Sequence, residues 1–168
     1  MHNLDTLFLD RDGVINVKLD AKYVENTFEF EFIIGAEMAI SKLSKIFNRI
    51  LIVTNQQGIG KGIMSDNDLC VVHEYMLFEL KKNGGIINKI YYCPHLAAKN
   101  CACRKPNPGL IKQAIIDFPQ IRTEDSYLIG DSDTDILAGK KLGLNTVKVD
   151  KEYTLLKWCD ELLSVIQY

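Results

Sequence analysis

The stretch TLFLDRDGVIN, residues 6–16, joins a short apolar run to a pair of aspartates. The run Thr6–Leu9 contains no charged residue and stops at Asp10, with Asp12 two positions further on. Continuous apolar runs of this length are typical of strands that are buried on both faces, as in a parallel sheet. The two aspartates therefore predict a polar functional site at the end of this strand.

Further apolar runs of the same kind occur along the chain, at residues 50–53, 89–93, 127–129 and 145–149. Between and after them, the spacing of apolar residues predicts helices at residues 36–47, 66–82, 108–118, 134–142 and 155–166. This alternation predicts an α/β fold with a doubly wound, Rossmann-like parallel sheet that has helices on both faces. In such sheets ligands bind at the carboxyl ends of the strands, so the polar clusters there are expected to converge on one crevice.

The composition sets limits on the class of protein. The chain has 168 residues, 47% of them hydrophobic, and a formal net charge of −2. This length fits a single domain spanning residues 1–168, without a large cap domain because no long insertion interrupts the pattern. The charge gives no reason to expect a nucleic acid or an anionic membrane as a partner, and no apolar run is long enough to span a bilayer. The start of the chain has no signal-peptide pattern, so we expect a cytoplasmic protein. A monomer is expected because the sequence shows no obvious extra apolar helix.

The segment CPHLAAKNCACRKP, residues 93–106, contains a cluster of metal-binding side chains: Cys93, His95, Cys101 and Cys103. Three cysteines and one histidine make a closed ligand set, which is typical of tetrahedral structural Zn²⁺. Buried free thiols are the alternative. The segment is too small to bury much of itself, so a metal would supply folding energy and would fix the cations that follow it, Arg104 and Lys105.

Two further cysteines and one histidine lie in helical patterns. We expect Cys70 and Cys159 to be small buried apolar residues. For His73 a packed or a surface role is expected.

Carboxylates gather at two strand ends. Asp10 and Asp12 follow the first run, and GDSDTD, residues 130–135, follows the fourth. Taken alone, the first pair could also be a polar turn with a corner at Asp12-Gly13. Several acids meeting in one crevice would repel one another unless a cation neutralised them, and hard oxygen ligands select Mg²⁺.

Groups that can bind phosphate lie at the other strand ends. Thr54 and Asn55 end the second run, where a hydroxyl and backbone N–H groups can bind phosphate oxygens. Beside the acids, the ammonium of Lys105 can neutralise a transferring phosphoryl group. The glycines of VTNQQGIGKG, residues 53–62, do not satisfy the P-loop pattern, and we expect a mobile loop there.

In the order DRDGV, TN, RKP and GDSDTD, these motifs resemble the four signatures of the haloacid dehalogenase superfamily of phosphotransferases. With the CxH…CxC loop, TNQQGI and CRKPNPG, the chain resembles the D-glycero-D-manno-heptose 1,7-bisphosphate phosphatases in particular. Histidinol-phosphate phosphatases have a similar zinc loop. The resemblance covers essentially the whole chain.

The resemblance implies a mechanism. Asp10 would attack phosphorus to form an aspartyl phosphate, and Asp12 would act as general acid and then general base. Mg²⁺ would be held by the carboxylates of Asp10 and Asp131 and by the backbone carbonyl of Asp12, while Thr54 and Lys105 would bind phosphoryl oxygens. Asp135 would orient Lys105 or a metal-bound water, although direct ligation stays open.

Substrate recognition is expected to come from short loops at residues 17–26 and 56–64 and from the zinc loop. Arg104 is the candidate for gripping a second phosphate, with a solvated surface arginine as the alternative. Tyr23, Asn55 and Gln56 are the further candidates for substrate contact. Lys22, where the heptose enzymes often have glycine, and Ser132, where some relatives have lysine, leave the sugar and the anomer open.

The leading hypothesis is an enzyme, a Mg²⁺-dependent phosphatase that removes the 7-phosphate of a heptose 1,7-bisphosphate. This step would feed nucleotide-activated heptose into lipopolysaccharide. The alternatives are a histidinol-phosphate phosphatase, a broad phosphatase for small sugar phosphates and, from another class, a zinc-stabilised binding protein with an inactive phosphatase fold. An inactive copy would be expected to lose Asp10, Asp12, Lys105 or Asp131, and all four are present.

Overall fold

The computed structural model describes residues 4–166, and its strands form one five-stranded parallel sheet of order β3-β2-β1-β4-β5. The strands are β1 (Thr6–Leu9), β2 (Arg49–Asn55), β3 (Lys89–Cys93), β4 (Tyr127–Gly130) and β5 (Asn145–Lys148). This order confirms the doubly wound sheet. The chain builds outward from the central β1 in one direction and then, with β4, in the other. The carboxyl ends of β1 and β4 therefore mark the switch point, where ligands bind in such sheets.

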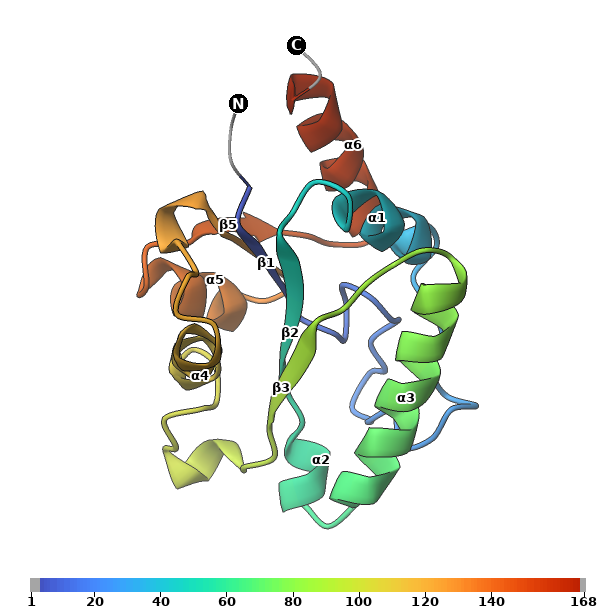
Figure 1. Ribbon diagram of the computed structural model, residues 1–168. Coiled ribbons are helices and arrows are strands. Elements are labelled where there is room, and N and C mark those ends of the chain that lie inside the picture. The colour runs from blue at the N-terminus through green and yellow to red at the C-terminus, as the bar shows by residue number, and fades with distance from the viewer. Residues whose placement is uncertain (1–3, 167–168) are drawn as a thin grey trace.

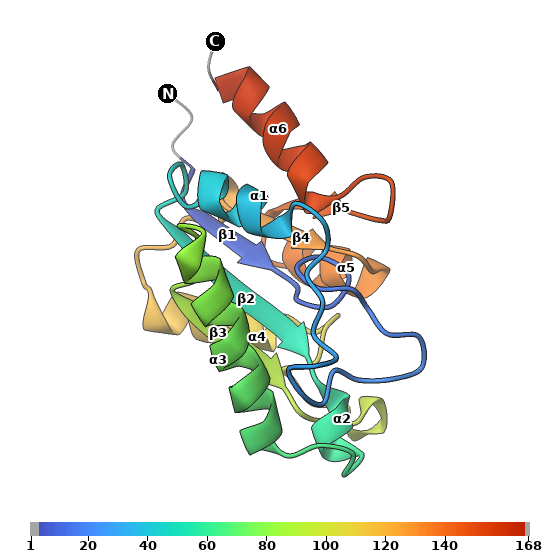
Figure 2. The same ribbon diagram turned by 90° about the vertical axis from the view of Figure 1, so that its right-hand side faces the viewer.

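The helices cover both faces of the sheet. They are α1 (Ala36–Leu43), α2 (Gln57–Gly60), α3 (Asp66–Lys82), α4 (Gly109–Asp117), α5 (Asp133–Lys140) and α6 (Leu155–Ile166). Short 3₁₀ turns occur at Ala97–Lys99 and Thr123–Asp125. Helices α1, α3 and α6 lie on one side of the sheet, and α4 and α5 lie on the other (Figures 1 and 2).

The alternation of side chains along β1 explains these two layers. Leu7 and Leu9 point into the core shared with α1, α3 and α6, whereas Phe8 points into the core shared with α4 and α5. All three side chains are fully buried. Because successive strand residues face opposite sides, an uninterrupted apolar run is what a strand covered on both faces requires.

Several element boundaries differ from the prediction. The first helix ends at Leu43, four residues before the predicted end. The Ser44 hydroxyl donates to the Ile40 carbonyl (2.7 Å), and residues 45–47 continue as turns whose N–H groups bond back to the carbonyls of Lys42 and Leu43 (3.0–3.1 Å). Residues 57–60 form a one-turn helix instead of a loop. Gly143 lies beyond α5 with a φ of 76°, a conformation that favours glycine at a helix end. Ser65 caps α3, in a capping box with Asp68.

The two helical cysteines have different environments. Cys159 is buried, as expected. The prediction for Cys70 was wrong, because Cys70 is exposed on the outer side of α3, where its thiol lies 3.7 Å from Glu74 Oε1. Residue type had suggested burial, but the phase of the helix decides which positions face the core.

All strands in the described residues belong to the one sheet, and no cap domain interrupts residues 4–166. Among the helices of this part of the chain, none combines the length and the apolar character needed to cross a bilayer.

Candidate active site

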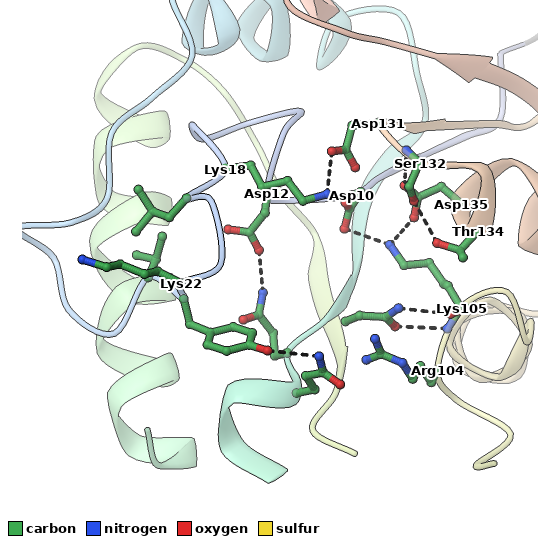
Figure 3. A pocket seen from close by; sticks show the side chains of 16 residues that line it. Asp10, Asp12, Lys18, Lys22, Arg104, Lys105, Asp131, Ser132, Thr134 and Asp135 are labelled. Atoms are coloured by element: carbon green, nitrogen blue, oxygen red, sulfur yellow. Dashed lines mark hydrogen bonds and ion pairs between the residues drawn. The ribbon is translucent and has the colours of Figure 1, made fainter. Parts of the chain in front are cut away.

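A cavity of about 240 Å³ opens at the carboxyl ends of the central strands (Figure 3). Its lining is strongly charged and includes Asp10, Asp12, Asp131, Asp135, Lys18, Lys22, Arg104 and Lys105. These side chains come from the segments after β1, β3 and β4, so the fold brings together the polar clusters that the sequence placed at strand ends. The expected single crevice is therefore present.

The ammonium of Lys105 is the centre of the charge network. Lys105 is 3% exposed, and its Nζ lies 2.8 Å from Asp10 Oδ1 and 2.6 Å from Asp135 Oδ1. Nζ also donates to the Val53 carbonyl (2.7 Å). Burial alone would lower the pKa of Lys105, but the two carboxylates outweigh burial and raise it. The residue is therefore a fixed cation.

Asp10 is held at the end of β1, with its N–H donating to the Ile129 carbonyl of β4 (3.0 Å). Its side chain is buried, and burial is the main reason that the pKa of Asp10 is raised to about 7. Lys105 opposes this shift, whereas the negative charge of Asp135 adds to it. An acid in this environment needs a further cation to be fully ionised.

Asn55 and Thr54 end β2 beside this network. Asn55 holds the main chain of Lys105 at both polar atoms, since its Nδ2 donates to the Lys105 carbonyl (3.1 Å) and its Oδ1 accepts the Lys105 N–H (3.0 Å). Asn55 lines the cavity. Thr54 is fully buried and lies outside the lining residues, and its hydroxyl oxygen accepts from Gln56 Nε2 (2.9 Å).

Asp12 points away from the other acids and is held by three donors. Arg11 Nη2 (2.9 Å) and Asn16 Nδ2 (3.0 Å) donate to its Oδ1. Gln56 Nε2 donates to its Oδ2 (2.9 Å). Burial would raise the pKa of Asp12, but the charge and the hydrogen bonds of Arg11 outweigh burial, with help from Asn16 and Gln56, and lower it. Asp12 is therefore a fixed carboxylate in the free protein.

Asp131 has one oxygen free for a ligand. Its Oδ2 accepts from Lys18 Nζ (2.7 Å), while its Oδ1 is buried and has no partner among the described residues (Figure 3). Carboxylate oxygens of Asp10, Asp131 and Asp135 lie within 4.8 Å of one another. A buried, unpartnered carboxylate oxygen in such a cluster fits a hard divalent cation such as Mg²⁺.

Gly13 permits this approach of the segments after β1 and β4. Its φ is 86°, and an added Cβ would collide with the side chain of Asp131. The turn also closes on the Arg11 carbonyl, which accepts the N–H groups of Val14, Ile15 and Asn16 (2.8–3.2 Å). The DG pair is a tight turn as well as part of the crevice.

The four predicted zinc ligands lie together. The Sγ–Sγ distances are 2.9 Å (Cys93–Cys103), 3.4 Å (Cys101–Cys103) and 3.5 Å (Cys93–Cys101). His95 Nδ1 lies 3.2 Å from Cys103 Sγ, and all four ligand atoms lie within 4.8 Å of one another. Burial and the neighbouring thiols raise the pKa of Cys93 to about 12, so these sulfurs cannot all ionise without a cation. The cluster fits tetrahedral Zn²⁺.

Arg104 and Tyr23 also line the cavity. Arg104 Nη1 is buried and has no hydrogen-bond partner among residues 4–166, which leaves a guanidinium edge available to an anion. Tyr23 accepts a hydrogen bond from Gln57 Nε2 at its hydroxyl (3.0 Å), and Lys61 Nζ lies 5.3 Å from the centre of its ring. The Lys22 side chain extends away from the acids (Figure 3).

Sequence reasoning assigned no role in the site to Lys18, Arg11 or His73. Lys18 reaches an aspartate 113 positions away, and no local spacing could predict that contact. Arg11 is fully buried behind Asp12 and lies 3.2 Å from His73 Nε2. The one available signal was the position of Arg11 between the two aspartates.

Comparison with known proteins agrees with this geometry. A family model described as HAD-hydrolase-like matches residues 102–161. The D-glycero-alpha-D-manno-heptose-1,7-bisphosphate 7-phosphatase of Mycobacterium bovis is 42% identical over 130 residues, which are 77% of this chain and 68% of that protein. The corresponding beta-heptose 7-phosphatase of Helicobacter pylori is 40% identical over 140 residues, 83% of this chain and 79% of that protein.

A solved structure gives the same result. The D,D-heptose 1,7-bisphosphate phosphatase from B. bronchiseptica, complexed with magnesium and phosphate, superposes with a TM-score of 0.88 at 28% identity, covering 96% of this chain and 99% of that one. The chain is thus a haloacid dehalogenase-like hydrolase. Within that class it belongs to the family of the heptose-1,7-bisphosphate 7-phosphatases.

Proposed function

We propose that this protein is a Mg²⁺-dependent phosphatase that removes the 7-phosphate of D-glycero-D-manno-heptose 1,7-bisphosphate, a step toward nucleotide-activated heptose. The observation that supports this most directly is the buried ammonium of Lys105 between Asp10 and Asp135, beside an Asp131 oxygen that has no partner. This arrangement offers a carboxylate nucleophile, a fixed cation and a place for a divalent ion within one small cavity. The names of the relatives from Mycobacterium bovis and Helicobacter pylori support the choice of substrate.

In the proposed reaction, Asp10 attacks the phosphorus of the 7-phosphate. The new bond joins an Asp10 oxygen to phosphorus, and the bond from phosphorus to the sugar oxygen breaks. Asp12, which is ionised in the free protein, takes up a proton from solvent when the anionic substrate binds and donates this proton to the sugar oxygen. Asp12 then accepts a proton from a water molecule that attacks the aspartyl phosphate. The bond between Asp10 and phosphorus breaks, inorganic phosphate leaves, and Asp12 releases its proton to solvent, so that both carboxyl groups return to their starting states.

The remaining residues bind and orient. Lys105 holds the phosphoryl oxygens, and Asp135 and Asn55 hold its side chain and its main chain. Thr54, to which the resemblance assigned the same oxygens, is fully buried outside the cavity lining, and we assign its hydroxyl the support of Gln56. Asp10, Asp131 and the backbone carbonyl of Asp12 would bind Mg²⁺, which offsets the repulsion between the carboxylates and the phosphate. Arg104 binds the second phosphate at the 1-position, and Tyr23 and Gln56 complete the substrate site.

The zinc loop acts as a brace in this proposal. Cys103 immediately precedes Arg104 and Lys105, so Zn²⁺ held by the cluster would fix where both cations point. Gly60 helps to seat the loop, because an added Cβ there would lie 2.5 Å from the Pro94 carbonyl oxygen. Thiolate ligands persist in a reducing compartment, which supports a cytoplasmic location. We propose that residues 1–168 function as a single domain and as a monomer.

A phosphate-release assay tests the function. Both anomers of the heptose bisphosphate are compared with histidinol phosphate and with simple sugar monophosphates, with Mg²⁺ and with a chelator. We expect the highest kcat/KM for one heptose bisphosphate anomer, loss of release with the chelator, and no release by an Asp10→Asn variant. A preference for histidinol phosphate, or no release with any ester, would refute the proposal.

A further inference from the structure

Arg11 and His73 form a buried polar pair behind Asp12. Arg11 is fully buried and His73, on α3, is 7% exposed. Arg11 Nη2 donates to Asp12 Oδ1 (2.9 Å), and Arg11 Nη1 lies 3.2 Å from His73 Nε2. A guanidinium stays protonated and can only donate, so His73 must accept at Nε2. The imidazole is therefore the neutral tautomer with its proton on Nδ1.

This pair is not explained by stability of the fold. A buried guanidinium has a large desolvation cost, and apolar residues of similar volume often stabilise such a site equally well or better. Here Arg11 Nε has no partner among the described residues, so even the hydrogen bonding is incomplete. Neither Arg11 nor His73 lines the cavity, so neither is placed to touch a substrate.

The pair does control the orientation of one carboxylate. Asp12 Oδ1 is held by Arg11 and Asn16, and Asp12 Oδ2 by Gln56. These donors come from the segments after β1 and β2, and His73 adds a contact from α3. His73 keeps the second terminal nitrogen of Arg11 occupied, so that the guanidinium cannot turn without losing a hydrogen bond in a buried site.

We propose that His73 is a positioning residue for the acid–base step: it fixes Arg11, and Arg11 fixes Asp12 in the geometry for proton transfer. This inference rests on the proposed role of Asp12. Proton transfer depends on sub-ångström placement, and displacement of a catalytic group by about 1 Å can cost on the order of 10²-fold in rate.

Two substitutions of His73 separate positioning from packing. His73→Gln can present an amide oxygen near the position of Nε2 and so keep the acceptor, whereas His73→Leu fills the space without one. We expect His73→Leu to lower kcat by about 10- to 100-fold with KM changed less than about threefold. We expect His73→Gln to restore kcat to within about threefold of the unchanged protein.

The outcomes are distinct. If His73 only packs, the glutamine variant, which buries an extra polar group, will be no better than the leucine variant, and the positioning role is overturned. The same holds if both variants keep full kcat. A wild-type chain that hydrolyses no phosphate ester overturns the proposed function together with this role, whereas failure of the glutamine rescue overturns the role alone.

A measurement on the wild-type protein needs no variant and applies even if His73→Leu does not fold. Nitrogen-15 NMR of the His73 ring distinguishes the two neutral tautomers. We expect an unprotonated Nε2 and a protonated Nδ1 at pH 7. A protonated Nε2 would remove the hydrogen bond from Arg11 and with it the proposal.

Discussion

The zinc loop and the acidic crevice both follow strand ends of the same sheet, but they are assembled in opposite ways. The four ligands of the loop lie within residues 93–103, a single segment that begins at the last residue of β3. In the crevice, Asp10 and Lys105 are 95 positions apart, and Lys18 and Asp131 are 113 apart. A cluster within one segment can be recognised from spacing, whereas a cluster between segments depends on the topology of the sheet.

The two regions are covalently linked at Cys103-Arg104-Lys105. The loop therefore positions two cations, Arg104 and Lys105, in a site whose acids follow other strands. If the loop is a scaffold and the crevice is the catalytic centre, substitutions in the two regions should differ in their effects on turnover and on stability. Loss of a crevice acid should stop turnover and spare the fold, while loss of a zinc ligand should weaken both.

The largest effect is expected for Asp10→Asn. The variant keeps the shape of the side chain but removes the nucleophile, so turnover should fall by about 10⁴-fold or more. Thermal unfolding should change little, because a neutral group suits a site where burial already raises the pKa of Asp10 to about 7. Phosphate release and calorimetry measure the two quantities. Asp133→Asn, at an exposed acid paired with Lys148, is the matched control. Appreciable turnover by Asp10→Asn would show that Asp10 in the crevice is not the nucleophile.

Lys105→Met tests the residue at the junction of the two regions. Loss of the ammonium should lower kcat by about 10²–10³-fold. It should also destabilise the protein by about 3 kcal/mol, because Asp10 and Asp135 remain as buried acids without their cation. Steady-state kinetics and denaturant unfolding measure these changes. The control Lys112→Met, at an exposed position on α4, should change neither kcat nor stability. If Lys105→Met changed them as little, Lys105 would not be the central cation of the charge network.

Cys103→Ser tests the scaffold. We expect the bound zinc to fall from about one ion per chain to nearly none, with a lower unfolding temperature, because metal binding supplies folding energy to this loop. We expect kcat/KM to fall by about tenfold as Arg104 and Lys105 lose their fixed positions. Elemental analysis and kinetics measure the outcome, with the exposed Cys70→Ser as control. Full zinc content, or full activity without zinc, would show that the loop is not a brace.

The pH dependence of stability tests the buried pair behind the crevice. Burial lowers the pKa of His73 from 6.5 to about 3, so between these values the unfolded chain binds a proton that the native protein does not. The contribution of His73 to stability is therefore present above pH 6.5 and lost as the pH falls toward 3. Relative to His73→Gln, the wild-type protein should lose about 2 kcal/mol of unfolding free energy between pH 7.5 and pH 5.

Denaturant unfolding of both chains at the two pH values measures this difference. A gap between wild type and His73→Gln that does not change with pH would show that the pKa of His73 is not lowered in the native protein. The difference in unfolding free energy between chains with histidine and with glutamine at position 73 can also be measured in the Cys103→Ser variant. An unchanged difference would show that the Arg11–His73 pair and the zinc loop contribute independently to stability.

The smallest effect is expected for Lys18→Met. The side chain of Lys18 is 55% exposed and its Nζ lies 2.7 Å from Asp131 Oδ2, so removal of the ammonium should change stability by less than about 1 kcal/mol. It also removes a positive charge beside a candidate Mg²⁺ ligand, and we expect Mg²⁺ to bind about threefold more tightly. Isothermal titration measures this affinity, with the exposed Lys151→Met as control. Weaker Mg²⁺ binding would indicate that Lys18 orients Asp131 instead of competing with the ion.

Much of the fold was predictable because its signals are local. The apolar runs located all five strands, and the predicted helix at residues 66–82 has the observed bounds, since a capping residue and helical spacing act within a few residues. The predictions failed where a boundary depends on a contact from elsewhere. Just after the first helix, the Ser44 hydroxyl accepts a hydrogen bond from the N–H of Ile86, 42 positions away (2.9 Å), and Cys70 lies on the outer side of its helix.

In the candidate site, too, the features that depend on short segments were predictable, whereas those that depend on distant contacts were not. The sequence by itself determined the zinc cluster, the aspartates at strand ends and the cation next to the loop, because ligand type, spacing and position after a strand are properties of short segments. Only the tertiary structure decided that Lys105 lies between Asp10 and Asp135, that Lys18 reaches Asp131, and that Arg11 and His73 hold Asp12. These contacts join parts of the chain that meet only when parallel strands align their carboxyl ends, and side-chain hydrogen bonds act over about 3 Å in space irrespective of distance along the chain.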